Sequence, residues 1–227
     1  MSLWLKFGWL AIFLSSMTNN AQAGIVVGGT RVIYDGGKKE TSISVINPQK
    51  SVPYLIQSWV EGESDSPSVK PPFIITPPLF RLDPGQENIL RIVHIKGQLP
   101  TNKESVYWLS IKSIPSSEQS ETNTLQISVK TRIKLFYRPA DLPGEANQAY
   151  KTLKFALGNN QLTVNNPSPY YVSFHNVKVG TSEIKDAGMI APFSTHNLTV
   201  PTGATGQVSW QAINDYGGIS EPTTEAP

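Results

Sequence analysis

Few side chains in this sequence have the types and spacing that catalysis requires. His94, His175 and His196 lie far apart, and no H-x-x-x-H pair or G-x-S-x-G nucleophile elbow is present. The 227 residues include no cysteine, which excludes thiol nucleophiles, disulfides and zinc–thiolate sites. Gly28 and Gly29 are not followed by the helix that a phosphate-binding loop requires. The sequence therefore indicates a protein that is not an enzyme and that has no catalytic residue, metal or cofactor.

Two carboxylates that lie close in the sequence, Glu61 and Glu63, have the residue types of a general acid and base pair. They begin a polar segment, residues 61–72, between two apolar runs. Solvated charges in a loop are the simpler interpretation, and we expect both residues to lie in water.

Two basic residues lie inside apolar runs, where a charge needs an explanation. Arg31 is in an expected strand beside the apolar residues 32–34, and Lys134 lies between Ile133 and Leu135. Such a side chain either lies on the exposed face of a strand or finds a partner, and the pattern alone favours the exposed face. The other basic residues are scattered and the formal net charge is only +2, which argues against a nucleic-acid surface.

The longest regular pattern runs from residue 125 to residue 139. Apolar side chains occupy alternate positions there, interrupted only by Thr131: Leu125, Ile127, Val129, Ile133, Leu135 and Tyr137. Polar and basic side chains fill the other row. This period of two predicts one long β-strand with an apolar face, which is either the seam of a sheet or an edge offered to a partner.

The other apolar runs are short, are separated by Pro, Gly and Asn, and lack the 3.6-residue period of a helix. They predict an all-β protein. Two Pro and one Gly within residues 139–144 predict a linker, so we expect two β-sandwich domains, residues 24–140 and 145–220. The polar, Pro-containing residues 221–227 are predicted to form a disordered tail.

The N-terminal residues have the pattern of a secretory signal peptide. One basic side chain, Lys6, precedes the apolar residues 7–14, and the small residues Ala21 and Ala23 follow. We therefore expect residues 1–23 to be removed. The apolar run is too short to span a bilayer stably, so a soluble exported protein beginning at Gly24 is predicted, without stable membrane insertion.

Four segments resemble the PapD-like periplasmic chaperones of the chaperone–usher pilus pathway, and they occur in the family's order. They are residues 30–36 (TRVIYDG), 76–82 (TPPLFRL), 131–139 (TRIKLFYRP) and 213–217 (INDYG). Residues 54–60 (YLIQSWV) make the first domain similar to the chaperones of type 1 pili within that family. The resemblance implies two immunoglobulin-like β-sandwich domains in a boomerang arrangement.

The resemblance also implies partners and a mechanism. Arg31 and Lys134 would bind the C-terminal carboxylate of a pilus subunit in the cleft between the domains. Leu125, Ile127 and Val129 would form the donor strand that completes the subunit's own sandwich. The implied protein is a periplasmic chaperone that binds pilins and adhesins, prevents their aggregation and delivers them to an outer-membrane usher. An apolar strand edge of this kind also invites self-association of the free protein.

Strict alternation raises a question about this assignment, because it places Lys134 on the strand face opposite to Leu125 and Val129. A bulge, a strong twist, or a cleft approached from the other side would reconcile the positions.

Three further residues, Glu104, Arg138 and Asp215, match the family positions of an interdomain salt-bridge network that holds the angle between the domains. Residues 76–78 (TPP) resemble the family's proline turn, in which a cis peptide bond is expected. Two alternatives remain. A pilin or adhesin would have one incomplete sandwich and often a cysteine pair, and a β-sandwich enzyme would need a clustered acid–base or metal site. The sequence shows neither.

Overall fold

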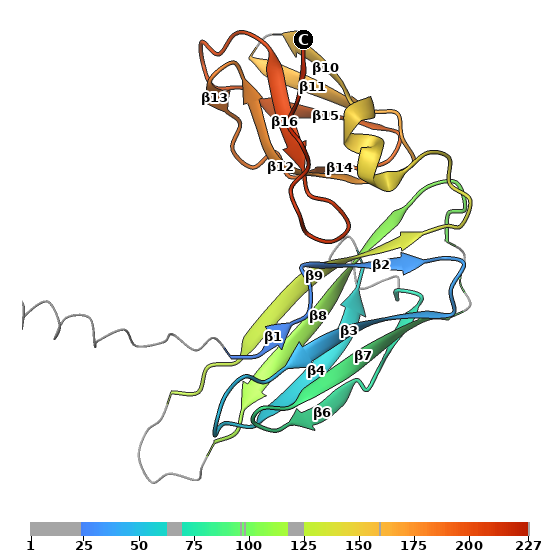
Figure 1. Ribbon diagram of the computed structural model, residues 1–227, viewed down its shortest axis with the longest axis vertical. Helices are drawn as coiled ribbons and strands as arrows, with labels where there is room; N and C mark the ends of the chain where they lie inside the picture. The colour runs from blue at the N-terminus through green and yellow to red at the C-terminus, as the bar shows by residue number, and fades with distance from the viewer. Residues whose placement is uncertain are drawn as a thin grey trace, which may run out of the picture.

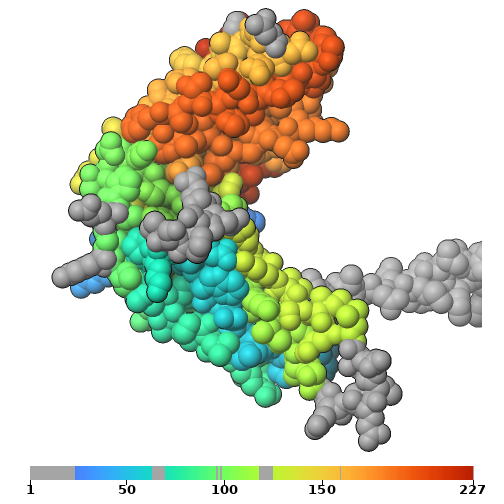
Figure 2. Space-filling view, turned by 180° about the vertical axis from the view of Figure 1, so that it is seen from behind, coloured from blue at the N-terminus to red at the C-terminus, as the bar shows by residue number. Residues whose placement is uncertain are grey.

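The computed structural model describes residues 24–62, 70–95, 97, 99–117, 125–158 and 160–226. It has two β domains that meet at an angle, with a hollow between them (Figures 1 and 2). The predicted all-β class with two sandwich domains is confirmed. The predicted signal peptide, residues 1–23, lies outside the described residues. In the described part of the chain, no helix is long and apolar enough to cross a membrane.

The first domain consists of two packed sheets (Figure 1). One sheet has the order β1-β3-β7-β5, formed by β1 (Val26–Val27), β3 (Glu40–Ile46), β7 (Glu87–His94) and β5 (Phe73–Thr76). The other has the order β2-β9-β8-β4-β6, formed by β2 (Arg31–Asp35), β9 (Val129–Arg138), β8 (Ser105–Pro115), β4 (Tyr54–Glu61) and β6 (Leu79–Leu82). Alternate side chains of both sheets meet in one core, in which Val45, Leu109 and Leu135 are fully buried. The Thr76–Pro77 peptide bond that precedes β6 is cis, as expected.

The second domain is a smaller sandwich. One sheet has the order β10-β11-β15, formed by β10 (Lys154–Gly158), β11 (Gln161–Asn166) and β15 (Ser194–Thr199). The other has the order β13-β12-β16-β17, formed by β13 (Ser182–Glu183), β12 (Val172–Val179), β16 (Val208–Ala212) and β17 (Thr223–Glu225), and β14 (Met189–Ile190) also pairs with β12. Trp210 lies at the centre of the core, where its ring packs 4.4 Å from that of Phe155 and its Nε1 donates to the Tyr150 carbonyl.

Two segments of the second domain differ from the prediction. Residues 146–152 form a 3₁₀ helix, η1 (Ala146–Thr152), which is too short to show a helical period in the sequence. The tail that we expected to be disordered contains β17, whose Thr223–Glu225 pair with residues 208–210 of β16. Pairing at the edge of a sheet uses backbone groups and needs no apolar side chains, so the polar composition of the tail concealed this strand.

The chain changes sheets between β1 and β2. β1 pairs with β3, whereas β2, which begins four residues later, pairs in parallel with β9 in the opposite sheet. The Gly28 N–H donates to the Ser44 carbonyl over 2.9 Å. A Cβ atom at Gly28 would approach the Ser44 side chain more closely than real Cβ atoms do, so the crossing favours glycine.

This change of sheet leaves part of β9 open. β2 pairs only with residues 134–138 of β9, whereas β8 pairs with residues 129–137 on the other side. Among the described residues, no strand pairs with residues 129–133 on the side away from β8. Outward-pointing N–H and C=O groups of this segment can therefore accept an additional strand.

A basic cleft beside an open strand edge

Arg31 and Lys134 lie next to each other at the point where the open edge ends. Arg31 is the first residue of β2, and it is the register partner of Lys134 on β9. Neither side chain is fully exposed. The Arg31 guanidinium lies 5.8 Å from the ring centre of Phe136 and donates through Nη1 to the Ile213 carbonyl of the second domain over 3.1 Å. Arg31 is therefore held in the seam between the domains, and Lys134 lies beside it.

These two cations are only partly neutralised by the protein. Burial lowers the pKa of Lys134, and the charge of Arg31 lowers it further. Burial likewise lowers the pKa of Arg31, although Asp215 and Glu104 oppose this effect. Within the described part of the chain, Lys134 has no ion-pair partner, and the buried Arg31 Nε has no hydrogen-bond partner. An anion that accepted hydrogen bonds from both groups would offset these costs.

Three large apolar side chains stand in water beside the open edge. Leu125, Ile127 and Val129 are 88%, 66% and 51% exposed, respectively. The same alternating row continues into the core of the first domain, where Ile133 and Leu135 are buried. A single apolar row thus supports the domain at one end and is offered to solvent at the other.

Val129 and Lys134 lie on one regular strand, which decides on which faces their side chains lie. The ladder between β8 and β9 is regular from the Ser105–Tyr137 pair to the Ser113–Val129 pair, so no bulge lies between Val129 and Lys134. Lys134 therefore lies on the opposite face of the strand from Val129. A bulge, one of the predicted ways to reconcile these positions, is absent from this part of the strand.

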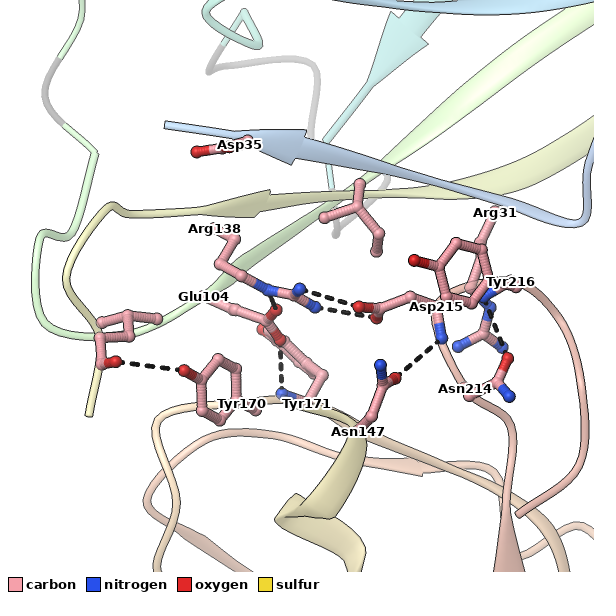
Figure 3. Close-up of polar contacts among 12 residues, drawn as sticks. Arg31, Asp35, Glu104, Arg138, Asn147, Tyr170, Tyr171, Asn214, Asp215 and Tyr216 are labelled. Carbon is pink, nitrogen blue, oxygen red and sulfur yellow. Dashed lines mark hydrogen bonds and ion pairs between the residues drawn. The ribbon is translucent and has the colours of Figure 1, made fainter. Parts of the chain in front are cut away.

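Arg138 lies at the centre of the contact between the two domains (Figure 3). Its Nε donates to Glu104 Oε1 over 2.7 Å, and its two terminal nitrogens donate to the two oxygens of Asp215, each over 2.8 Å. Asp215 belongs to the second domain, so this bidentate pair crosses the interface. The geometry is that of a strong, charge-assisted interaction. Burial alone would lower the pKa of Arg138, but the hydrogen bonds to Asp215 and Glu104 and the charges of these two carboxylates raise it overall.

Glu104 is the most deeply buried member of this network, with 3% of its surface exposed. Desolvation raises the pKa of Glu104, which Arg138 and the Tyr171 N–H oppose. That N–H belongs to the second domain and donates to Glu104 Oε2 over 2.7 Å. A buried carboxylate is tolerated only when its oxygens are satisfied in this way, so both domains are needed to hold it.

Several residues of the interface could not have been identified from sequence patterns. The Asp215 N–H donates to the side chain of Asn147 on η1 (Figure 3). The ring centre of Phe136 lies 5.7 Å from that of Tyr171. Asn147 lies in a segment with no distinctive pattern. Phe136 belongs to the row of the long strand that is otherwise polar and basic, and it is buried where it packs against Tyr171 of the second domain.

The prediction for Glu61 is wrong. Glu61 is the last residue of β4 rather than part of a loop, and it accepts hydrogen bonds or ion pairs from four side chains: Trp59, Ser110, Lys130 and Arg132. Glu63 lies outside the described residues. The error has a physical reason, since the partners of Glu61 come from three strands that only the folded sheet brings together.

Two protein-family models together match most of this chain. The N-terminal domain model of the PapD pili and flagellar-assembly chaperones matches residues 24–143, and the C-terminal domain model of the PapD pili assembly chaperones matches residues 148–224. The chain belongs to the PapD family of pilus-assembly chaperones. It is therefore a pilus chaperone rather than an enzyme, and the predicted family is confirmed.

Individual relatives support this family assignment over nearly the full chain. The probable fimbrial chaperone LpfB of Escherichia coli O157:H7 is 46% identical over 224 residues, which are 97% of this chain and 96% of the relative. The chaperone FimC of Escherichia coli K12 is 38% identical over 223 residues, 97% of this chain and 91% of the relative. The relatives are fimbrial chaperones, and such proteins act in the periplasm.

Solved structures of family members have the same two-domain fold. A chain of the Salmonella enterica complex between the SafA pilin and the SafB chaperone matches with a TM-score of 0.83 and 34% identity, covering 92% of this chain and 99% of that chain. The Escherichia coli chaperone DraB matches with a TM-score of 0.79 and 36% identity, covering 89% and 95% respectively. The arrangement of two sandwiches is thus shared with crystallised chaperones of this family.

The interdomain ion pair generates a prediction about domain orientation. Replacing Asp215 by Ala removes the bidentate partner of Arg138 and should weaken the contact between the domains by about 1–2 kcal/mol, because the pair is only partly exposed. We expect a broader distribution of interdomain angles, measured by small-angle X-ray scattering. Asp83→Ala is the matched control, because it removes an exposed pair with Arg81 inside the first domain. Identical scattering from both variants would contradict an orienting role.

Proposed function

We propose that this chaperone captures fimbrial subunits in the periplasm by lending them the open edge of β9. A subunit that lacks one strand of its own sandwich would pair its backbone with residues 129–133 and place its apolar groove over Leu125, Ile127 and Val129. Arg31 and Lys134 would bind the carboxylate at the subunit's C-terminus. The observation that carries the proposal is the position of this poorly neutralised cation pair at the end of the open edge.

The cation pair also indicates the direction of the captured strand. A strand added beside residues 129–133 would lie on the side of β9 that β2 occupies from Lys134 onward. The added strand would therefore end where β2 begins, at Arg31. If it runs parallel to β9, as β2 does, its C-terminal end arrives there. A carboxylate at that end would be attracted by both cations, whereas an N-terminal ammonium would be repelled. The parallel direction is therefore favoured by charge.

The magnitudes suit reversible but tight capture. Each aliphatic side chain that is transferred from water into a groove contributes about 1.5–3 kcal/mol, before the cost of ordering the two chains. Hydrogen bonds between the carboxylate and the two cations contribute about 1.5–3 kcal/mol each. Leu125, Ile127 and Val129 would thus provide most of the affinity, and the cations would provide a fixed end point.

The network of Glu104, Arg138 and Asp215 has a supporting role in this proposal. It would hold the two domains at the angle that keeps the cleft open to the subunit, since its bonds cross the interface near Arg31. Relatives with the same two domains include the chaperone of a solved pilin complex, which favours this use of the cleft.

The cellular setting completes the proposal. Residues 1–23 would direct export and be removed, and the chaperone would then protect subunits from aggregation and deliver them to an outer-membrane usher. The sequence contains no phosphate-binding motif, so folding of the subunit at the usher is the expected energy source for release. The free protein would shield its exposed row by self-association.

Removing either cation should abolish capture without unfolding the protein. For Lys134→Ala and Arg31→Ala we expect the loss of a stoichiometric complex when the protein is purified from the periplasm of cells that co-express the cognate subunit. Neither side chain belongs to the apolar core, so circular dichroism should be unchanged. Lys185→Ala, at an exposed position of the second domain, is the control. Normal co-purification with both cleft variants would refute the carboxylate assignment.

A charge in the apolar row should weaken the complex. Ile127→Glu places a carboxylate where the subunit groove is apolar, and we expect at least about a tenfold loss of affinity, or about 1.4 kcal/mol, by calorimetry. Ser128→Glu adds the same charge one residue later, on the other face of the exposed segment, and should have a smaller effect. Equal effects of the two variants would remove Ile127 from the proposed contact.

The lowered pKa of Lys134 predicts that capture weakens at alkaline pH. The ammonium binds the carboxylate only while it is protonated, so affinity should be full below the lowered pKa and should fall as the pH rises through it. This loss should begin below the value of about 10.4 for a free lysine. Lys134→Arg remains charged throughout, and its affinity should be nearly constant between about pH 7 and pH 10. A parallel fall in both proteins would assign the pH dependence to another group.

A further inference from the structure

Three cations lie on the same face of β9, at every second residue. They are Lys130, Arg132 and Lys134, and the open edge runs beside the first two and ends at the third. Each of them is a chemically suitable partner for a carboxylate at the end of an added strand. The strand itself therefore offers three anchoring points.

Alternation of side chains does not distinguish these three points. A strand that slips by two residues moves by about 7 Å and still directs the same row of side chains to the same face. An apolar groove laid over Leu125, Ile127 and Val129 would thus remain in phase after such a slip. Correct register needs a contact that is unique along the strand.

Glu61 removes two of the three anchoring points. Its Oε1 lies 2.7 Å from Lys130 Nζ, and its Oε2 lies 3.1 Å from Arg132 Nε. Trp59 Nε1 and Ser110 Oγ also donate to this carboxylate, over 2.8 Å and 3.0 Å. Burial alone would raise the pKa of Glu61, but the hydrogen bonds from Lys130, Trp59 and Ser110 lower it overall, so the group is ionised at neutral pH.

Glu61 pairs with Lys130 and Arg132, although it lies in the same row of the sheet as Lys134. Trp108 on β8 is the register partner of both Glu61 and Lys134, so it separates these two residues in that row. The ring of Trp108 lies 4.7 Å from the guanidinium of Arg132. Lys130 likewise lies 5.0 Å from the ring of Trp59. The two tryptophans thus hold the neutralised cations against the sheet.

We infer that Glu61 is a specificity-determining residue that sets the register of the captured strand. By occupying Lys130 and Arg132, it leaves Lys134, together with Arg31, as the anchoring point for the terminal carboxylate on this face of the described part of β9. This inference rests on the proposed function. It adds Glu61, a residue that would not itself contact the C-terminus of the subunit. Glu61 acts through the cations that it neutralises.

The test compares four proteins: wild type, Glu61→Gln, Lys134→Ala and the double variant Glu61→Gln/Lys134→Ala. The probe is a synthetic peptide that copies the last strand of the fimbrial subunit retained by the wild-type protein, made as the free acid and as the C-terminal amide. Affinity is measured by calorimetry. We expect Lys134→Ala to bind the free acid poorly, and the double variant to bind it at least about tenfold more tightly than Lys134→Ala, because Lys130 and Arg132 become available.

The amide peptide separates anchoring from a general effect of charge. It lacks the terminal carboxylate, so the added Glu61→Gln change should not restore its binding. Glu40→Gln is the matched control, because Glu40 pairs with Arg91 elsewhere in the first domain and its removal should restore nothing. Circular dichroism verifies that each variant is folded, and Glu61→Ala provides a second neutral replacement.

Register is measured directly with a spin label near the C-terminus of the free-acid peptide. In the wild-type protein, the strongest paramagnetic broadening should fall on the backbone amides around Lys134. In the double variant it should move by two to four residues toward Lys130, that is by about 7–14 Å along β9.

The outcomes separate this inference from the proposed function. If the wild-type protein binds the free acid and the double variant binds no better than Lys134→Ala, the inference is overturned while the proposed function stands. Equal rescue of acid and amide peptides, or unchanged broadening in the double variant, also overturns it. If the wild-type protein retains no fimbrial subunit, the proposed function fails and this inference fails with it.

Discussion

The backbone hydrogen bonds of β9 are incomplete on one side, and the rest of the structure is arranged around this edge. Within the described part of the chain, residues 129–133 pair with β8 but with no strand on their other side. The cause is the change of sheet at Gly28, which takes β1 to β3 and brings in β2 only at Lys134. An open edge beside exposed aliphatic side chains normally leads to aggregation, so soluble proteins avoid it. Here the same edge borders a cation pair and an interdomain cleft, which in the proposed function would make the edge selective.

The charges around the cleft are arranged so that the cations facing it stay available. Arg138 binds both nearby carboxylates, Glu104 and Asp215, and so limits their access to Arg31. Arg31 instead donates to a neutral carbonyl of Ile213. Burial of Arg31 and Lys134 is costly without a counter-charge, and that cost becomes affinity when a carboxylate arrives. The interdomain network therefore has two physical effects, since it joins the domains and also holds their acids in hydrogen bonds to Arg138.

The sequence predicted those parts of the fold that arise from local pattern. Alternation along residues 125–139 revealed the long strand, and Pro and Gly within residues 139–144 marked the boundary between two sandwiches. The residues of the interdomain network were found only through resemblance to a family, because Glu104, Arg138 and Asp215 are far apart in the chain. Glu61 was misplaced and β17 was missed for the same reason. Their partners lie on other strands, and no period within one segment reports a contact across a sheet.

Two glutamates, Glu104 and Glu61, illustrate how charge can supply information that a hydrophobic pattern lacks. A row of alternating aliphatic residues specifies which face of a strand is apolar, but it is unchanged by a slip of two residues. Glu104, through Arg138, and Glu61, through Lys130 and Arg132, each satisfy cations next to the cleft. Among the cations on this face of the described part of β9, Lys134, beside Arg31 at the end of the open edge, has no ion-pair partner. In the proposed function, apolar burial would provide affinity for many subunits, while one charged end point would set where each strand stops.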